Sequence, residues 1–167
     1  HNAQGIGIEG VFHIHENDEV ETPGYLIIQS FDFLKRSGDD KFIETIFPML
    51  EWCWNVQQRN LAKGMLPFNG DETYVAGGFL PRSALNDGSA EATMLFIDGG
   101  EELLNWVKKH EIWSSAKLDN ERMVLDNTRN SFRENFWNNG QLITNNPQRR
   151  SYINIPRFRH GVCERSG

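Results

Sequence analysis

Two adjacent carboxylates, Asp71 and Glu72, occur in the stretch LPFNGDETYVAGG, residues 66–78. A carboxyl group can act as a general acid when its pKa lies near the working pH. Burial among apolar groups raises that pKa, and so does a neighbouring like charge. Because Glu72 follows Phe68 and neighbours Tyr74, we take it as the first candidate, with Asp71 as the charge beside it. The alternative is a pair of loop acids, one of which caps a turn through its own backbone.

A second cluster of reactive side chains is FHIHENDE, residues 12–19. His13 and His15 alternate on an expected strand, so both point to one face. Imidazole and carboxylate groups could bind a metal there, but two histidines without a convincing third ligand are weak evidence for one. We therefore predict no metal and no cofactor. Without a ligand, these residues form a solvated acidic loop.

Three further side chains could contact a ligand through hydrogen bonds or ring stacking. Arg82 and Asp87 belong to PRSALNDGSAEA, where Asp87 and Gly88 could equally form a turn before a helix. Trp52 and Trp54 are two residues apart on an expected helix, so they do not share a face. At most one of them, here Trp54, should line a cavity, and core packing is the alternative for either ring.

Composition excludes several classes of function. The 167 residues carry a net charge of −6, which disfavours nucleic acid and anionic membranes as partners. No apolar run approaches the roughly 18 residues of a membrane span. Cys53 lies in an apolar run and is expected to be buried, and no phosphate loop or Ser-His-Asp arrangement is present. The compartment is not predicted.

The elements that must position these groups are mainly helical. Asp39 and Ser89 are predicted N-caps, and Thr22 is predicted to cap the helix that begins at Pro23. Asn139-Gly140 is predicted to end the last helix. The predicted helices are 23–36, 40–58, 89–109 and 115–138.

Three features interrupt the helical pattern. Pro48 should kink or split the second helix, and Gly99-Gly100 should weaken or jog the third. Residues 59–88 have no helical periodicity, yet they hold many apolar side chains, so we predict a long, ordered loop. Extended segments are expected at residues 5–16 and after Gly140. The coarse architecture is two helical hairpins joined by the loop.

The order of these features resembles a known group of enzymes. The run ETPGYLIIQSFDFLKRSGDDKFIETIFPMLEWCWNVQQ is similar to one hairpin of the six-hairpin glycosidases. These are (α/α)6-barrel glycoside hydrolases, which include glucoamylase-like and rhamnosidase-like enzymes. The following run, GMLPFNGDETYVAGGFLPRSALNDGSAEATMLFI, resembles the loop that delivers a catalytic acid in that group. The resemblance covers roughly residues 11–110 and is more specific for the fold than for the substrate.

The resemblance implies roles for several of these residues. Glucoamylase-type loops favour Glu72 as the acid, whereas the rhamnosidase-type loop favours Asp71. Segments before the first helix face the sugar in this group, and the stretch after the loop enters a helix that lines the cavity. The residues predicted to contact a carbohydrate, from the resemblance or from their own chemistry, are His15, Glu16, Asn17, Trp54, Tyr74, Arg82 and Asp87.

The resemblance also implies that the catalytic site is incomplete in this chain. The fold class would be mainly α, with about two of the six hairpins of an (α/α)6 toroid and short extended segments at both ends. Residues 1–167 would be a single domain, part of a larger catalytic domain. Because no second catalytic carboxylate can be matched, we expect the isolated chain to be inactive. The alternative is a non-catalytic helical module that binds carbohydrate or another protein.

Overall fold

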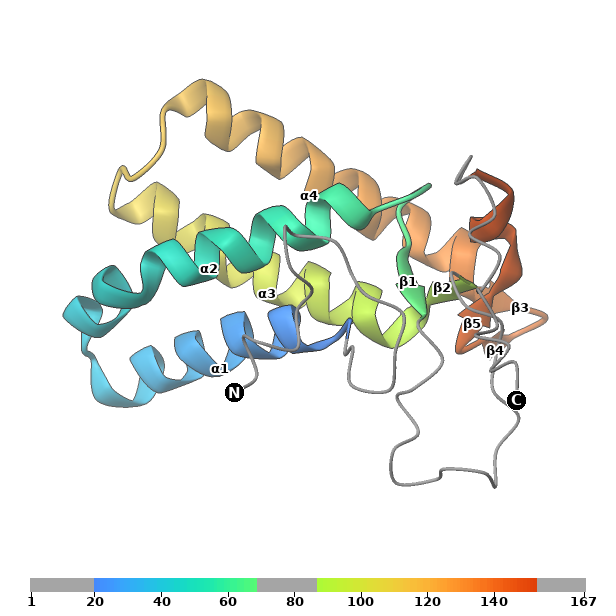
Figure 1. Ribbon diagram of the computed structural model, residues 1–167, viewed down its shortest axis with the longest axis horizontal. Helices are drawn as coiled ribbons and strands as arrows, with labels where there is room; N and C mark the ends of the chain where they lie inside the picture. The colour runs from blue at the N-terminus through green and yellow to red at the C-terminus, as the bar shows by residue number, and fades with distance from the viewer. Residues whose placement is uncertain (1–19, 69–86, 153–167) are drawn as a thin grey trace, which may run out of the picture.

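Four α-helices carry most of residues 20–68 and 87–152, which are the part of the chain that this computed structural model describes (Figure 1). The predicted mainly helical fold is confirmed, and the arrangement as part of a toroid stays a prediction. The helices are α1 (Thr22–Ser37), α2 (Asp40–Asn60), α3 (Ala90–Lys109) and α4 (Ser115–Phe136). Within the described ranges, no helix combines the length and the apolar character needed to cross a membrane.

Local capping sets most of the helix ends, as the sequence predicts. The Asp39 carboxylate accepts a hydrogen bond from the Phe42 amide at 3.1 Å, and the Ser89 hydroxyl accepts one from the Ala92 amide at 3.1 Å. The predicted cap of α1 is wrong by one residue. Glu21 is the N-cap, and its backbone is already near the helical region, so Thr22 lies inside the helix.

Neither predicted interruption divides its helix. α2 runs unbroken from Asp40 to Asn60 with Pro48 inside it, so of the two predicted outcomes, a kink or a split, the split does not occur. α3 likewise continues through Gly99 and Gly100, which are both buried. A Cβ on Gly100 would lie 2.5 Å from Cζ3 of Trp54. The glycine therefore allows two helices to approach closely, a packing role that outweighs its low helix propensity.

Asn139 and Gly140 do not cap α4; they form the turn of a β-hairpin. α4 ends at Phe136, two residues earlier than predicted, and is followed by β3 (Trp137–Asn138) and β4 (Gln141–Leu142). Asn139 and Gly140 have φ values of 48° and 81°, which suit the two-residue turn that matches strand twist. The same dipeptide is a helix end signal and a hairpin signal, and here the hairpin forms.

A small antiparallel sheet closes the base of the long loop. β1 (Leu66–Phe68) pairs with β2 (Asp87–Ser89), and β2 pairs with β5 (Asn145–Asn146). A 3-10 helix, η4 (Pro147–Tyr152), follows. Because Phe68 lies opposite Asp87 in the register, the loop leaves and rejoins the described structure at one point. The predicted loop therefore contains a short strand at each end, and residues 69–86 lie outside the described residues.

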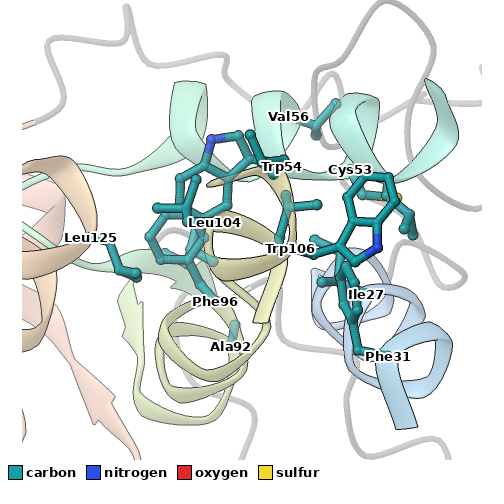
Figure 2. Packing of buried hydrophobic residues seen from close by; sticks show 14 of the residues in the cluster. Ile27, Phe31, Cys53, Trp54, Val56, Ala92, Phe96, Leu104, Trp106 and Leu125 are labelled. Carbon is teal, nitrogen blue, oxygen red and sulfur yellow. The ribbon is translucent and has the colours of Figure 1, made fainter. Parts of the chain in front are cut away.

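The core lies among α1, α2 and α3 and extends to α4 (Figure 2). α1 packs along both α2 and α3, and α3 packs along α4. Trp54 of α2 stacks on Phe96 of α3, with ring centroids 4.6 Å apart and planes 8° from parallel. Cys53 is fully buried as expected, and this burial raises the pKa of its thiol to about 12.

Candidate functional site

The segments that carry the predicted site residues leave the described structure at one end of the helical bundle. There α1 begins, β1 ends and β2 begins (Figure 1). The Tyr25 hydroxyl in the first turn of α1 donates to Glu91 Oε1 in the first turn of α3, at 3.0 Å. Two helix N-termini therefore lie side by side, next to the sheet that closes the loop. We call this region the loop end of the bundle.

Most of the predicted site residues lie outside the described residues. The structure therefore neither brings the two candidate catalytic carboxylates together nor separates them from the contact residues. The residues in question are His15, Glu16, Asn17, Asp71, Glu72, Tyr74 and Arg82. Of the predicted set, Trp54 and Asp87 are described.

Asp87 lies at the loop end. It is the first residue of β2 and only 5% exposed. The alternative reading of Asp87-Gly88 as a turn is wrong, because both residues pair with β1. Gly88 is required by close packing, since a Cβ there would lie 2.6 Å from the sulfur of Met65. Asp87 therefore sits in a rigid strand at the base of the loop.

Trp54 lies in the core and not at a surface. Its side chain is fully buried, one face stacks on Phe96, and its indole N–H donates to Glu121 Oε2 with an N–O distance of 3.0 Å. A sugar ring would have to displace Phe96 to stack there. Core packing, the alternative considered for this residue, is what the structure shows.

Trp137 is the most exposed of the five tryptophans, and the sequence analysis did not single it out. It lies in β3 and is 50% exposed. The signal that could have found it is the Asn139-Gly140 turn, since a residue two positions before such a turn lies on a hairpin strand. The assignment of residues up to 138 to a helix hid that signal.

Gln57 adds a buried carboxamide at the loop end. Its side chain is fully buried, and within the described part of the chain neither amide atom has a hydrogen-bond partner. A Cβ on Gly24 in the first turn of α1 would lie 3.3 Å from Gln57 Nε2. Leaving a buried amide unbonded costs about 1–3 kcal/mol. No sequence signal marks this residue, because glutamine is common on helix surfaces.

Helix N-termini and carboxylates act in opposite directions on charge at the loop end. Helix N-termini carry partial positive charge, and both α1 and α3 begin here. The hydrogen bond to Glu91, burial, and the charges of Glu91 and Glu21 all raise the pKa of the Tyr25 hydroxyl. Tyr25 therefore remains a neutral donor. A carboxyl group needs apolar surroundings or a second carboxylate to remain protonated near such helix ends.

Arg149 fixes the sheet to the end of α2. It is 3% exposed; its Nε donates to the Met65 carbonyl at 2.9 Å, and its Nη2 donates to the Asn60 carbonyl at 2.6 Å. Burial lowers the pKa of its guanidinium to about 10, so it remains charged at neutral pH. The sequence analysis treated this region as extended and missed the anchoring role.

A groove of about 370 Å³ runs between α3 and α4, beginning one turn from the start of α3. Its wall contains a polar network in which Glu101 accepts hydrogen bonds from Arg122 at 3.0 Å and Arg129 at 2.5 Å. The bond from Arg129, followed by that from Arg122, lowers the pKa of the Glu101 carboxyl. The groove is lined by Met94, Ile97, Asp98, Glu101, Arg129 and Phe132.

The described ranges contain no group of three or more histidine, cysteine or acidic side chains that could hold a metal ion. Comparison with protein-family models, with curated proteins and with solved structures found no match. The class that the structure itself defines is a mainly α protein of two helical hairpins with a loop-closing sheet at one end. A more specific function therefore depends on the sequence motifs.

Proposed function

We propose that this chain is part of a glycoside hydrolase in which Glu72 is the general acid. Asp71 beside it raises the pKa of Glu72, or takes over the role of acid itself. A second carboxylate from elsewhere in the full-length protein activates water or attacks the sugar directly, because glycoside hydrolysis requires two such groups. The substrate is a carbohydrate, and no cofactor is needed for this chemistry.

The single observation that carries the proposal is the packing of α1 against α3. These are the first helices of two successive hairpins, and they lie side by side with both N-termini at the loop end. An arrangement of repeated hairpins with like helices adjacent is what a toroid of helical hairpins requires. This packing supports the proposed glycoside hydrolase, which otherwise depends on sequence motifs alone.

The base of the loop gives further support. β1 and β2 pair at the ends of residues 69–86, so the loop with Asp71 and Glu72 is attached at the loop end through a short sheet. Asp87, at the base of the loop, is buried, and a buried side chain there can hold an adjacent loop residue in place. Catalytic groups on loops need such a rigid base, because small displacements of a reacting group are costly.

The test is turnover of neutral and acidic oligosaccharides by the full-length protein. Glu72→Gln should lower kcat by about 10²–10⁴-fold, since a general acid contributes that much. It should also remove the high-pH limb of the rate profile, which reports loss of the acid's proton. Glu44→Gln, at an exposed position on α2, is the matched control and should leave turnover unchanged.

Two outcomes would contradict the proposal. If Glu72→Gln and Asp71→Asn both turn over substrate like the wild type, the assignment of the acid is wrong. If the full-length protein binds oligosaccharides and cleaves none, the chain belongs to a non-catalytic carbohydrate-binding module. The isolated 167 residues should show no turnover in any case, because the second carboxylate is not among them.

A further inference from the structure

The hairpin β3–β4 presents apolar side chains to solvent. Trp137 and Leu142 lie directly opposite each other in the register, and they are 50% and 45% exposed. A cross-strand pair of this kind stabilises a hairpin by roughly 0.2–1 kcal/mol. The pair leaves about half of the surface of Trp137 accessible to solvent.

The hairpin is held in a defined place and is not a free appendage. The Ile143 amide donates to the Phe136 carbonyl at 2.8 Å, and the Ala90 amide in the first turn of α3 donates to the Thr144 carbonyl at 3.0 Å. Phe136, just before the hairpin, is fully buried. These contacts place the hairpin beside the loop end, next to the sheet that closes the loop (Figure 1).

The composition of this region selects the chemistry of a partner. No charged residue occurs from Trp137 to Gln148, in a chain of which 24% is charged. Exposed carboxamides surround the ring in sequence, and each can both donate and accept a hydrogen bond: Asn138, Asn139 and Gln141. An exposed tryptophan flanked in sequence by carboxamides and not by charged groups suits a neutral, hydroxylated ligand better than an ionic one.

We propose that Trp137 is a stacking platform for one ring of a neutral oligosaccharide. The indole face buries the C–H groups of the sugar ring, and the hairpin amides bond its hydroxyl groups. This inference rests on the proposed function and specifies it: the substrate is a neutral sugar chain, not a uronic acid polymer.

Self-association through the hairpin is the competing explanation. Its strands have two residues each, and short edge strands are a means by which proteins avoid pairing with other chains. Residues 137–148 also carry no charged side chain that could form an ion pair with a second copy. A sugar ring therefore fits the hairpin better than a second copy of this chain.

The binding test is native affinity electrophoresis of the 167-residue chain. Gels would contain soluble starch, mixed-linkage β-glucan, xylan or mannan as neutral polymers, and polygalacturonate as the acidic one. At least one neutral polymer should retard the wild type. Trp137→Ala should weaken that binding about tenfold, the equivalent of a 1.4 kcal/mol stacking interaction. Trp137→Phe should keep part of it, and Met123→Ala, which removes an equally exposed apolar side chain from α4, should keep all of it.

A second measurement uses the unmodified fold. The chain has five tryptophans, so five indole N–H signals are expected in a nitrogen–proton NMR spectrum. Addition of oligosaccharides from the retarding polymer should shift the Trp137 signal, assigned with Trp137→Phe. The signals of Trp54, Trp106 and Trp113 should stay in place, because their N–H groups are bonded to Glu121, Asp40 and Glu51.

Several outcomes would overturn the platform. One is that no neutral polymer retards the wild type. The others are that Trp137→Ala is retarded as much as the wild type, or that polygalacturonate retards the wild type as much as the neutral polymers do. Dimerisation in sedimentation velocity that Trp137→Ala abolishes, without glycan binding, would assign the hairpin to self-association instead. Binding through Trp137 without turnover by the full-length protein would refute the proposed hydrolysis and leave the platform standing. Turnover that depends on Glu72, together with binding that Trp137→Ala leaves unchanged, would refute the platform and leave the proposed hydrolysis standing.

Discussion

Trp54 and Trp137 have opposite environments in the same chain. Trp54 lies among α2, α3 and α4, fully buried, with Phe96 against its face and Gly100 against its edge (Figure 2). Trp137 lies on a hairpin at the loop end, half exposed, with Leu142 across the ladder. A tryptophan can therefore build the core or present a binding face, and composition does not distinguish the two.

The two regions also differ in how they would tolerate change. Around Trp54 the atoms are close-packed, so removal of a side chain leaves a void and addition of one creates a clash. Around Trp137 the solvent can fill any space that a substitution leaves. Stability should therefore depend on the first region, and ligand recognition should depend on the second. The predictions below test this contrast.

The largest effect on stability is expected from Trp54→Ala. Large-to-small changes at a buried aromatic cost about 3–5 kcal/mol, because apolar contacts are lost and a cavity remains. Trp137→Ala, the matched control, should change the free energy of unfolding by less than about 1 kcal/mol, because it removes only a cross-strand pair at an exposed position. Urea unfolding followed by circular dichroism measures both. Similar losses in the two variants would show that the hairpin, too, belongs to the cooperative core.

A smaller loss is expected from Gly100→Ala, although alanine favours helices by up to about 1 kcal/mol. The new Cβ would lie 2.5 Å from Trp54 Cζ3 and 3.0 Å from Leu125 Cδ1, and overpacking typically costs about 1–3 kcal/mol. In the same unfolding assay, Trp54→Phe should partly relieve the clash, so the double variant should lose less than the sum of the two single variants. A more stable Gly100→Ala would mean that this junction is loosely packed.

The smallest effect is expected at Glu101, on the wall of the groove between α3 and α4. Its partners Arg129 and Arg122 lower the pKa of its carboxyl in the folded state. The stability that this provides is therefore complete above the ordinary glutamate pKa of about 4.3 and is lost as the pH falls through the lowered folded value. Melting temperatures between neutral and strongly acidic pH should fall less steeply for Glu101→Gln than for the wild type.

The partner variant Arg129→Gln gives an internal check on the effect at Glu101. It should flatten the same part of the pH profile, and the double variant should add little, because both changes remove one interaction. High salt should reduce the difference, since these side chains are partly exposed. Identical pH profiles for the wild type and Glu101→Gln would show that the network does not stabilise the fold.

Local features of the sequence predicted much of the fold. Asp39 and Ser89 cap their helices as expected, because an N-cap interacts with amides only three residues away. Pro48 was expected to kink or split α2 and does not split it, because tertiary packing can hold a helix together where propensity alone would end it. The prediction that Asn139-Gly140 ends the last helix was wrong, because this dipeptide is compatible with both a helix end and a hairpin turn.

The candidate site was predictable only in part. The acids of the loop and the carbohydrate chemistry came from motifs, and the structure adds the paired base of that loop. Trp54 was misassigned to a cavity because spacing on one helix does not reveal which neighbour covers it. Gln57 and Arg149 were missed because their burial arises from several separate elements.

The sequence by itself determined the mainly helical class, the caps at Asp39 and Ser89 and the acidic character of the chain, because these depend on neighbouring residues or on simple sums. Only the tertiary structure decided that α1 lies against α3 and that Trp54 is interior while Trp137 is exposed. Burial is a property of contacts between residues far apart along the chain. The same side chain therefore becomes core in one place and a binding face in another, according to what packs over it.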